Sequence, residues 1–329
     1  MNLVTGATGL VGTHVLLTLL QQGKKVVATR RKNSNVTEVE KVFSYYTPDA
    51  KKLFDQIVWK EIDLQDVLAL EELLEGISSV YHCAAVVSLS NSDKNSLFKV
   101  NTEGTANLVN ACLEKKIKAF CFVSSITTIQ NNDIKTELDE NVLWKSNQKQ
   151  NAYSLSKYLA EQEVWRGIEE GLNAVIVNPG VIVGPGNWHR GTGKLFSTSK
   201  RGVKFYTEGT NGFVGVMDVA KIMTRLLDKK IFGERFILVE NNYSFRRILE
   251  QIHLALGKTP PSINASKRFL QLGRIFTFLL PDDLQINSSM IDTLLEKTRY
   301  SNSKLFRYLD YHYQPIEECI RFSATVYNQ

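Results

Sequence analysis

Short apolar runs alternate with amphipathic stretches through the first half of the chain. The amphipathic stretches place apolar residues three or four positions apart, as helices that pack on a sheet do, and the apolar runs have the length of buried strands. This alternation predicts an α/β fold, in which a doubly wound parallel sheet carries helices on both faces and binds ligands at the carboxyl ends of its strands. The predicted strands are residues 2–4, 25–28, 57–60, 79–82, 119–123 and 174–177, and the predicted helices are residues 12–22, 66–74, 99–115 and 152–169.

The pattern is interrupted twice and changes near residue 180. Residues 33–54 predict a polar loop and one helix, and residues 130–151, which are polar and lack clear periodicity, predict a surface loop near the ligand site. Beyond residue 180, glycine and proline punctuate a loop, and shorter strands and helices follow. We therefore expect a first domain over residues 1–180 and a smaller, substrate-binding lobe over residues 181–329, with a strand near residues 235–239 that returns to the first domain.

Three glycines follow the first predicted strand directly and open the first predicted helix, in the order Gly6-x-x-Gly9-x-x-Gly12. In that setting each glycine has a physical reason, because the chain must turn tightly, approach a diphosphate closely and pack the helix against the strand. The positive end of the helix then faces the phosphates. The motif predicts a Rossmann domain that binds a dinucleotide through the loop residues Gly6, Thr8, Gly9, Leu10, Val11 and Gly12.

Basic residues end the second predicted strand, where a dinucleotide-binding fold holds the adenosine ribose. An acidic residue at this point accepts hydrogen bonds from a free 2′-hydroxyl, whereas arginine pairs with a 2′-phosphate. The sequence has Arg30, Arg31 and Lys32 here, with no acidic residue. A charge-assisted hydrogen bond contributes roughly 1.5–3 kcal/mol, so the pattern favours NADP(H) over NAD(H), with a solvated basic turn as the alternative.

Further strand ends supply candidate cofactor contacts. Asp63 and Leu64 follow the third strand, where Asp63 either accepts a hydrogen bond from the adenine amine or caps a helix. The small residues Ala84 and Ala85 follow the fourth strand and permit close contact, while His82 before them fits a packed strand histidine better than a catalyst. The remaining candidates are Asn101, which is either a cofactor contact or a polar packing residue, and Pro179, Gly180 and Val181, whose backbone can meet the nicotinamide carboxamide.

Tyr153 and Lys157 lie four residues apart in a predicted helix, so their side chains share one face. A tyrosine with a pKa of about 10 is a poor general acid or base at neutral pH. A neighbouring ammonium group stabilises the phenolate, so we expect a lowered pKa for Tyr153, which can then exchange a proton with a carbonyl or alcohol oxygen. Ser125, at the end of the fifth strand, is preferred to Ser124 for holding that oxygen. The alternative explanation for the spacing of Tyr153 and Lys157 is an ordinary amphipathic helix. The alternative for either serine is a residue that caps a turn.

Composition and charge narrow the class of protein. The 329 residues are 43% hydrophobic and carry a net charge of +6, with scattered basic residues that are not interleaved with aromatic ones, so we expect no nucleic-acid partner. No apolar run is long enough to span a bilayer and the chain starts directly with a strand, which predicts a cytoplasmic protein without a signal peptide or membrane span. The four cysteines form no C-x-x-C or Cys/His cluster, so they predict buried thiols and no metal site.

Together these motifs resemble the extended short-chain dehydrogenases/reductases, in the branch of the dihydroflavonol reductases and 3β-hydroxysteroid dehydrogenases, within the NAD-dependent epimerase/dehydratase superfamily. The resemblance implies an oxidoreductase that interconverts a ketone or aldehyde and an alcohol, with Ser125, Tyr153 and Lys157 as catalytic residues. It also implies NADP(H) as the cofactor, a small-molecule carbonyl or alcohol as the substrate, and allows a homodimer. The matching pieces are TGATGLVG at 5–12, ATRRK at 28–32, DL at 63–64, HCAA at 82–85, NTEGTANLV at 101–109, FVSS at 122–125, YSLSK at 153–157, NPGVIVGPG at 178–186 and VMDVA at 216–220.

Two other functions stay open on the sequence. A sugar-nucleotide epimerase or dehydratase would hold NAD tightly, but the family's epimerases have an acidic residue at the position of Arg30. The dehydratases have an Asp-Glu pair just after the serine strand, where this chain has Ile126 and Thr127. The second alternative is a dinucleotide-binding protein without catalytic activity.

Substrate specificity is expected from segments between and after the matching pieces. The aromatic side chains there also fit the core of the lobe, which is the stronger interpretation for Trp188 and Phe196. The apolar run at residues 269–280 fits packing on the lobe better than contact with a membrane surface or another subunit. The full set of candidates is residues 86–89, residues 130–151, Trp188, His189, Arg190, Leu195, Phe196 and residues 205–213.

Overall fold

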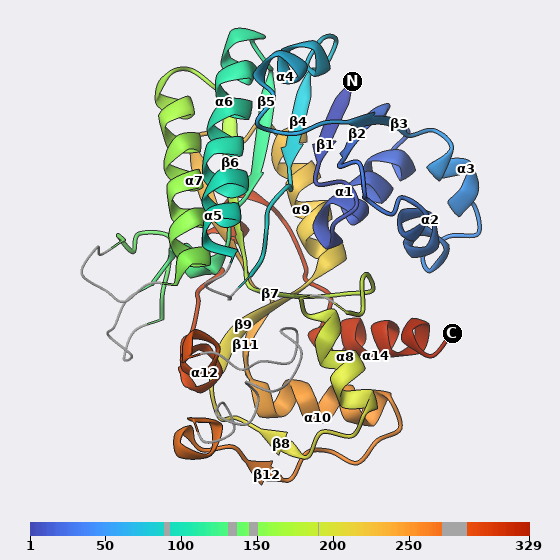
Figure 1. The fold of residues 1–329 in the computed structure, drawn as a ribbon, viewed down its shortest axis with the longest axis vertical. Helices are drawn as coiled ribbons and strands as arrows, with labels where there is room; N and C mark the ends of the chain where they lie inside the picture. Colours follow the sequence, from blue (N-terminus) through green and yellow to red (C-terminus); the bar gives the residue numbers. More distant parts are fainter. Residues whose placement is uncertain (89–92, 131–136, 145–150, 190, 272–287) are drawn as a thin grey trace.

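The computed structural model describes residues 1–88, 93–130, 137–144, 151–189, 191–271 and 288–329, and a seven-stranded parallel sheet lies at its centre (Figure 1). The strand order is β10-β6-β5-β4-β1-β2-β3, so the chain starts mid-sheet and builds outward in both directions, as the predicted doubly wound fold requires. β10 (Glu234–Leu238) comes from the second half of the chain and pairs with β6. The six predicted strands are confirmed as β1 (Asn2–Thr5), β2 (Val26–Arg30), β3 (Val58–Glu61), β4 (Ser79–His82), β5 (Ala119–Val123) and β6 (Ala174–Pro179).

Successive strand residues pack on opposite faces of this sheet, because side chains alternate along a strand. On one face Val4 and Ala28 join the core beneath α1 (Leu10–Gln21) and α9 (Val216–Asp228). On the other face Leu3 and Val27 join the core beneath α4 (Val67–Leu73), α6 (Gly104–Glu114) and α7 (Ala152–Glu169). Figure 1 shows α6 and α7 on one side of the sheet and α1 and α9 on the other. Both faces are therefore covered, and ligands can reach only the strand ends.

The first interrupting segment contains two helices, so the prediction of one helix in residues 33–54 is wrong. They are α2 (Thr37–Ser44) and α3 (Ala50–Phe54), and Pro48 lies in the turn between them. Proline disfavours helical backbone in the residue before it, so the chain cannot run through this point as one helix. Val39 and Phe43 of α2 are buried in the core next to α1, which is why a segment of polar appearance folds onto the domain.

The predicted helix at residues 99–115 begins earlier and is not uniform. α5 (Lys94–Leu97) leads into a wider π-helical turn at Phe98–Glu103, and α6 follows. Local π-helical turns often mark functional positions, and this one contains Asn101.

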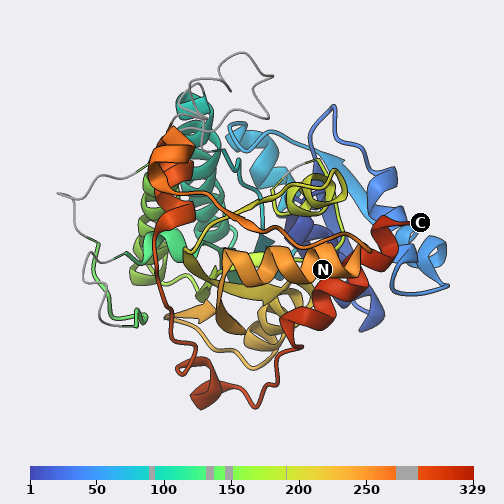
Figure 2. The same ribbon diagram turned by 90° about the horizontal axis from the view of Figure 1, so that it is seen from below.

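The second half of the chain builds a lobe below the sheet (Figures 1 and 2). Its centre is a three-stranded sheet in the order β11-β9-β7, formed by β7 (Val181–Val183), β9 (Thr210–Gly215) and β11 (Asn241–Ser244). A separate parallel pair, β8 (Phe205–Tyr206) and β12 (Ile263–Asn264), lies at the far end of the lobe. The helices around these strands are α8 (Gly193–Lys200), α10 (Phe245–Ala255), α12 (Ser288–Leu295) and α14 (Ile316–Tyr327). The short helix α13 (Leu305–Tyr308) instead packs on β10 of the large sheet.

Within the described residues, no helix combines the length and the apolar character needed to cross a bilayer. The four cysteines are unpaired thiols: Cys112, Cys121 and Cys319 are buried, and Cys83 is half-buried at the end of β4. Burial raises the pKa of each of these thiols, which agrees with their interpretation as packing residues.

Candidate active site

The glycine loop between β1 and α1 is closed so tightly that side chains would not fit. Gly6 has a φ of +62°, and a Cβ atom on it would lie 2.6 Å from the backbone nitrogen of Ala84. A Cβ atom on Gly12 would lie 2.3 Å from the carbonyl oxygen of Gly6, which also accepts a hydrogen bond from the N–H of Gly9 at 2.9 Å. Gly9 is the N-cap residue of α1, so the loop leads into the first, unpaired amides of that helix, as a diphosphate cradle requires. The other predicted loop contacts, Thr8, Leu10 and Val11, are half-buried at the same turn.

The two arginines after β2 differ in their surroundings. Arg30 is half-buried, and its Nη2 lies 3.2 Å from Oε2 of Glu61, the residue paired with it at the end of β3. Arg31 is exposed, and its backbone N–H donates to Ser34 Oγ, which closes a small turn. The local sequence around Arg30 does not reveal the Glu61 contact, which arises because adjacent parallel strands end at the same edge. Arg31 thus presents the guanidinium group that is more accessible to an anion.

Asp63 and Leu64 form the turn after β3. Asp63 is exposed, and its Oδ1 accepts a hydrogen bond from the backbone N–H of Gln65 at 3.0 Å. The helix-cap alternative for Asp63 is wrong, because Asp66 caps α4 by accepting from the N–H of Ala69 at 3.1 Å. Leu64 is buried in the core beneath α4 and α6. Asp63 is therefore left at the surface of the strand edge, with its side chain shaping the turn.

His82 is buried and used in packing, as predicted. One ring nitrogen lies 2.7 Å from the hydroxyl of Thr5 and the other 2.9 Å from the hydroxyl of Thr105. Burial lowers the pKa of His82 to about 3, and the nearby charge of Lys157 adds to this effect. The imidazole is therefore neutral at neutral pH, and with both nitrogens in hydrogen bonds it is not placed to act as a general acid or base.

Asn101 uses its whole amide inside the protein. Its Oδ1 accepts from the N–H of Val86 at 2.7 Å, and its Nδ2 donates to the carbonyl of Val86 and to the hydroxyl of Ser156, both at 3.0 Å. Asn101 therefore ties the loop after β4 to α7. This geometry favours the polar-packing alternative over the cofactor contact predicted for this residue.

The backbone after β6 passes close to β9. A Cβ atom on Gly180 would lie 2.4 Å from the carbonyl oxygen of Gly212, so packing between strands already requires glycine there. Pro179 ends β6 and Val181 begins β7, and these residues carry the chain from the large sheet into the lobe. Ala84 is half-buried against Gly6, and Ala85 beside it is exposed.

Ser125, Tyr153 and Lys157 come together at the carboxyl ends of β5 and β6. Asn151 caps α7 by accepting from the N–H of Ser154 at 2.7 Å, which sets the start of the helix that carries Tyr153 and Lys157. Ser125 follows β5, and its hydroxyl hydrogen-bonds the Tyr153 phenol. Of the two adjacent serines, Ser125 is thus the one that contacts the tyrosine.

Thr127 is a contact of this site that the sequence analysis missed. Its hydroxyl donates to Ser125 Oγ at 3.0 Å, and its backbone N–H donates to the same atom at 3.2 Å. Two donors on Ser125 Oγ leave the serine proton directed to another acceptor, the Tyr153 oxygen. The short 3₁₀ turn Ile126–Thr128 makes this possible, because it brings Thr127 back over Ser125.

The pKa of Tyr153 is raised rather than lowered, contrary to the expectation from sequence. Burial of the phenol raises the pKa, and the hydrogen bond from Ser125 opposes that rise. Lys157 does not point its charge freely at the phenol: its Nζ donates to the carbonyl oxygen of Val123 at 2.7 Å and lies 4.3 Å from the ring centroid of Phe122. The sequence spacing gave the common helix face but not this direction of the ammonium group.

Lys157 is only 2% exposed, and burial lowers its pKa to about 7. The negative charge of Glu161, one helical turn further along α7, opposes that change and raises the pKa. Glu161 is itself fully buried, and Nη1 of Arg235 on β10 lies 3.0 Å from its Oε1. Buried Lys157, buried Glu161 and half-buried Arg235 therefore carry alternating charges from α7 to β10.

The carboxylate of Glu161 also joins the ends of β5 and β6. Its Oε2 accepts from Ser124 at 2.6 Å, from Thr128 at 3.0 Å and from Asn178 at 2.9 Å. Asn178 also donates to the carbonyl of Ser125 at 3.2 Å, and the single hydroxyl proton of Thr128 is shared between Glu161 Oε2 and that carbonyl, which lies 2.9 Å away. Ser124 is thus engaged with the buried carboxylate, and the backbone of Ser125 is fixed from below.

The segment at residues 137–144 is packed, which corrects the expectation of a surface loop for this part of residues 130–151. Arg235 donates to the carbonyls of Glu140 and Val142, and Oε1 of Glu140 accepts from the N–H of Ile237 at 2.8 Å. Trp144 stacks on Tyr158 of α7 with ring centroids 4.2 Å apart. Residues 131–136 and 145–150 lie outside the described residues.

The candidate specificity residues fall into different places. Phe196 is buried, and Trp188 packs against Phe196 and Tyr327, so both belong to the lobe's core as predicted. His189 is exposed. Leu89, Arg190 and residues 272–280 lie outside the described residues.

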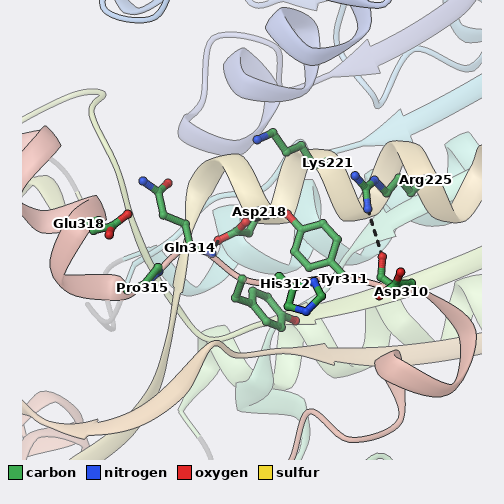
Figure 3. A pocket seen from close by; sticks show the side chains of 10 residues that line it. Asp218, Lys221, Arg225, Asp310, Tyr311, His312, Gln314, Pro315 and Glu318 are labelled. Atoms are coloured by element: carbon green, nitrogen blue, oxygen red, sulfur yellow. Dashed lines mark hydrogen bonds between the residues drawn. The ribbon is translucent and has the colours of Figure 1, made fainter.

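A pocket of about 670 Å³ lies away from these residues, between α9 and the chain that leads into α14 (Figure 3). Asp218 of the VMDVA motif lines it and accepts hydrogen bonds from the hydroxyl of Tyr311 at 2.6 Å and the N–H of Gln314 at 3.2 Å. Arg225 reaches the carbonyl of Asp310 at its other end. Asp218 thus ties α9 to the C-terminal segment, and the pocket contains none of the predicted site residues.

Known proteins are similar to this chain over most of its length. The profile of the NAD dependent epimerase/dehydratase family matches residues 2–238. The chain is 30% identical over 267 residues to a putative dihydroflavonol 4-reductase of Synechocystis sp., which covers 78% of this chain and 73% of that protein. It is 28% identical over 274 residues to sterol demethylase protein B of Methylococcus capsulatus, covering 82% and 79%. Among solved structures, the crystal structure of gox2253 matches with a TM-score of 0.83 at 25% identity, covering 100% of this chain and 98% of that one.

Proposed function

Because the chain belongs to the NAD dependent epimerase/dehydratase family, we propose that it is an NADP(H)-dependent oxidoreductase that interconverts a ketone or aldehyde and an alcohol. Within the family it falls in the extended short-chain branch, with relatives that are named dihydroflavonol 4-reductases. The observation that carries the proposal is the contact of Ser125 with Tyr153 above buried Lys157, at the strand edge that also holds the glycine cradle.

In the reductive direction Tyr153 gives its phenolic proton to the substrate oxygen, and Ser125 holds that oxygen by a hydrogen bond. A dinucleotide held at the glycine loop would provide the hydride chemistry for reduction of the carbonyl carbon and for the reverse oxidation. Lys157 shares a face of α7 with Tyr153, and its ammonium donates to the carbonyl of Val123, so it fixes the end of β5 two residues before Ser125. Thr127 fixes the rotamer of Ser125, so the oxygen is held without further rearrangement.

The residues present fit a dinucleotide with a 2′-phosphate. Gly6 and Gly12 leave space that a Cβ atom would fill, at the start of a helix whose first amides are unpaired. Arg31 is exposed beside them at the end of β2, where charge-assisted hydrogen bonds to a phosphate are available. These features support NADP(H) as the cofactor.

Titration with NADPH and NADH separately, followed by a panel of ketones and aldehydes with the preferred cofactor, tests the proposal. We expect tighter NADPH binding and NADPH oxidation with at least one carbonyl compound. A protein that purifies with stoichiometric NAD and turns over without net oxidation would instead be an epimerase or dehydratase. Cofactor binding without turnover across the panel would indicate a non-catalytic dinucleotide-binding protein.

The substitution Tyr153→Phe isolates the proton-transfer step. Loss of a general acid lowers turnover by roughly 10²–10⁴-fold, while NADPH affinity should stay close to that of the parent protein. Tyr158→Phe is the matched control, because it removes a phenol on the same helix that stacks on Trp144. Turnover that survives Tyr153→Phe would refute the assigned role.

A further inference from the structure

The strand pair β8 and β12 lies at the far end of the lobe (Figure 1), and three large apolar side chains lie on it and on the helical turn that follows. Ile263 of β12 is the register partner of Phe205 on β8, so both side chains leave the same face of this parallel pair. The ring of Phe269, in a helical turn at residues 267–271, lies 4.9 Å from the ring of Phe205. The exposed fractions of Phe205, Ile263 and Phe269 are 39%, 44% and 45%. A monomer seldom leaves a cluster of this kind in water without a use for it.

The segments that carry these side chains, residues 199–207 and 254–271, are here called the tip. They contain no aspartate or glutamate, and their six basic residues are all exposed. Among the ion pairs of the described residues, the only one that involves the tip joins Lys267 to Asp292 at 3.6 Å, with both side chains largely in solvent. The tip's basic residues are Lys200, Arg201, Lys204, Lys258, Lys267 and Arg268.

Two acidic residues border the tip, and both lie near the same arginine. Arg246 lies 2.8 Å from Glu250 on α10 and 3.7 Å from Glu208, which directly follows the first segment of the tip. Arg246 also covers the ring of Tyr206, the β8 residue that follows Phe205. One arginine balances one of these two carboxylates, so the six cations of the tip outnumber the acidic charges at its border.

Lys204 shows how closely charge and apolar surface are joined. It precedes Phe205 in the chain, and its carbonyl accepts hydrogen bonds from the N–H groups of Ser262 and Ile263 at 3.1 and 2.9 Å. Arg268 precedes Phe269 in the same way. The two exposed phenylalanines thus each follow a basic residue in the chain, and Ile263 hydrogen-bonds the backbone of one of those basic residues, so cations border the apolar side chains as on surfaces that lie in a membrane interface.

We propose that the tip binds the surface of an anionic lipid bilayer. Phe205, Ile263 and Phe269 lie at the boundary between headgroups and acyl chains, and the six cations lie over the headgroups. A second copy of the chain fits this face less well, because a symmetric contact would oppose two acid-free basic surfaces. A nucleic acid fits less well because Ile263 offers no ring for stacking and the two phenylalanine rings contact each other at a tilt.

This contact would leave the proposed catalytic site free, since the carboxyl ends of the strands lie where the large sheet meets the lobe, whereas β8 and β12 lie at the far end of the lobe (Figure 1). The inference does not depend on the proposed reaction. It concerns the location of the protein, and its test measures vesicle binding rather than turnover.

Vesicle sedimentation with the full chain tests the proposal. We expect the protein to sediment with vesicles of phosphatidylcholine mixed with phosphatidylglycerol, to stay in solution with phosphatidylcholine alone, and to be released as salt is raised. Charge reversal by Lys204→Glu with Arg268→Glu should weaken partitioning by roughly 25-fold or more, because each cation contributes about fivefold. Phe205→Ser with Phe269→Ser should weaken it by about tenfold or more.

Matched controls lie on the first half of the chain. Lys51→Glu with Lys52→Glu reverses two exposed charges on α3, and Leu68→Ser removes an exposed apolar side chain on α4; both should sediment as the parent does. Sedimentation that is absent, or unchanged in the tip variants, overturns the proposal. A molar mass in solution that is lower for the Phe269→Ser variant, and unchanged for the control variants, would instead assign the tip to contact with a second copy of the chain. If the parent and the controls bind an oligothymidine probe, the tip variants do not, and no protein binds vesicles, the tip would be assigned to nucleic-acid binding.

Discussion

Lys157 carries its charge in a buried position, so the groups around it decide whether it is protonated. Burial lowers its pKa to about 7, and the carboxylate of Glu161 raises it. The two residues are four positions apart on α7, which the sequence shows, but the burial of Glu161 depends on Arg235, Ser124, Thr128 and Asn178 from distant parts of the chain. Local sequence does not distinguish such a glutamate from the exposed ones on the same helix.

Glu161→Gln should move the pH dependence of turnover. Without the carboxylate, the pKa of Lys157 falls further, so the ammonium form is lost at lower pH and the basic limb of kcat/KM shifts to lower pH. The profile of kcat/KM against pH measures this shift. Glu163→Gln, which removes a partner of Arg166 on an outer face of the helix, should leave the limb in place. A slower Glu161→Gln enzyme with an unchanged limb would mean that Glu161 acts only in packing.

Arg31→Ala and Arg30→Ala should separate the roles of the two arginines. Arg31 is exposed, so its removal should weaken NADPH binding by about tenfold, the equivalent of one charge-assisted hydrogen bond, and leave NADH binding unchanged. Arg30 is paired with Glu61, and its removal should cost less because the phosphate must compete for that guanidinium. Fluorescence titration with both cofactors measures the difference. Equal losses for NADPH and NADH would rule out a 2′-phosphate contact.

At the scale of elements, the glycine loop shows how closely the strand–turn–helix unit is constrained. Its three glycines and their spacing were read from the sequence, and the structure gives each close approach a partner atom.

The segments that departed from prediction did so for local reasons: Pro48 divides residues 33–54 into two helices, and a π-helical turn interrupts the helix expected at residues 99–115. Residues 137–144 departed for a tertiary reason, since Arg235 holds their carbonyls.

Gly12→Ala should abolish NADPH binding at accessible concentrations. Its Cβ would lie 2.3 Å from the carbonyl oxygen of Gly6, so the backbone of the loop must shift away from the cradle geometry. Gly202→Ala is the control, because its φ of +81° strains an alanine by roughly 1–2 kcal/mol while its surroundings are open. We expect a lower melting temperature and unchanged NADPH affinity for Gly202→Ala. Tight NADPH binding by Gly12→Ala would show that the loop is not the cradle.

At the scale of the whole molecule, buried polar residues join segments that are far apart in the chain. His14 of α1 lies 3.0 Å from the hydroxyl of Tyr46, beyond α2, and 2.8 Å from the carbonyl of Leu10. Asp218 holds the segment before α14, and Arg235 joins β10 to α7. These contacts join elements that are distant in the chain, and the shifted pKa values of His14 and Asp218 make the stability of the protein depend on pH.

His14→Gln should reduce the loss of stability in acid. Burial lowers the pKa of His14 from 6.5 to about 4. Between these pH values His14 is protonated in the unfolded chain and neutral in the folded chain. The free energy of unfolding therefore falls as pH drops from 6.5 toward 4. The full effect is about 3 kcal/mol for this residue. Melting temperatures across this range should fall less steeply for His14→Gln than for the parent. His189→Gln, at an exposed histidine, should leave the slope unchanged, and equal slopes for all three proteins would contradict the prediction.

The sequence alone determined the order of strands and helices, the glycine loop and the spacing of Tyr153 and Lys157, because periodicity, glycine and helical repeat are local properties. Only the tertiary structure decided where charge is placed: Lys157 donates to Val123, Glu161 is buried against Arg235, and Arg30 is paired with Glu61. It also decided that Phe205, Ile263 and Phe269 share one exposed, basic face. These arrangements depend on residues that meet only when the sheet and the lobe have formed, and no pattern within a short stretch of chain carries that information.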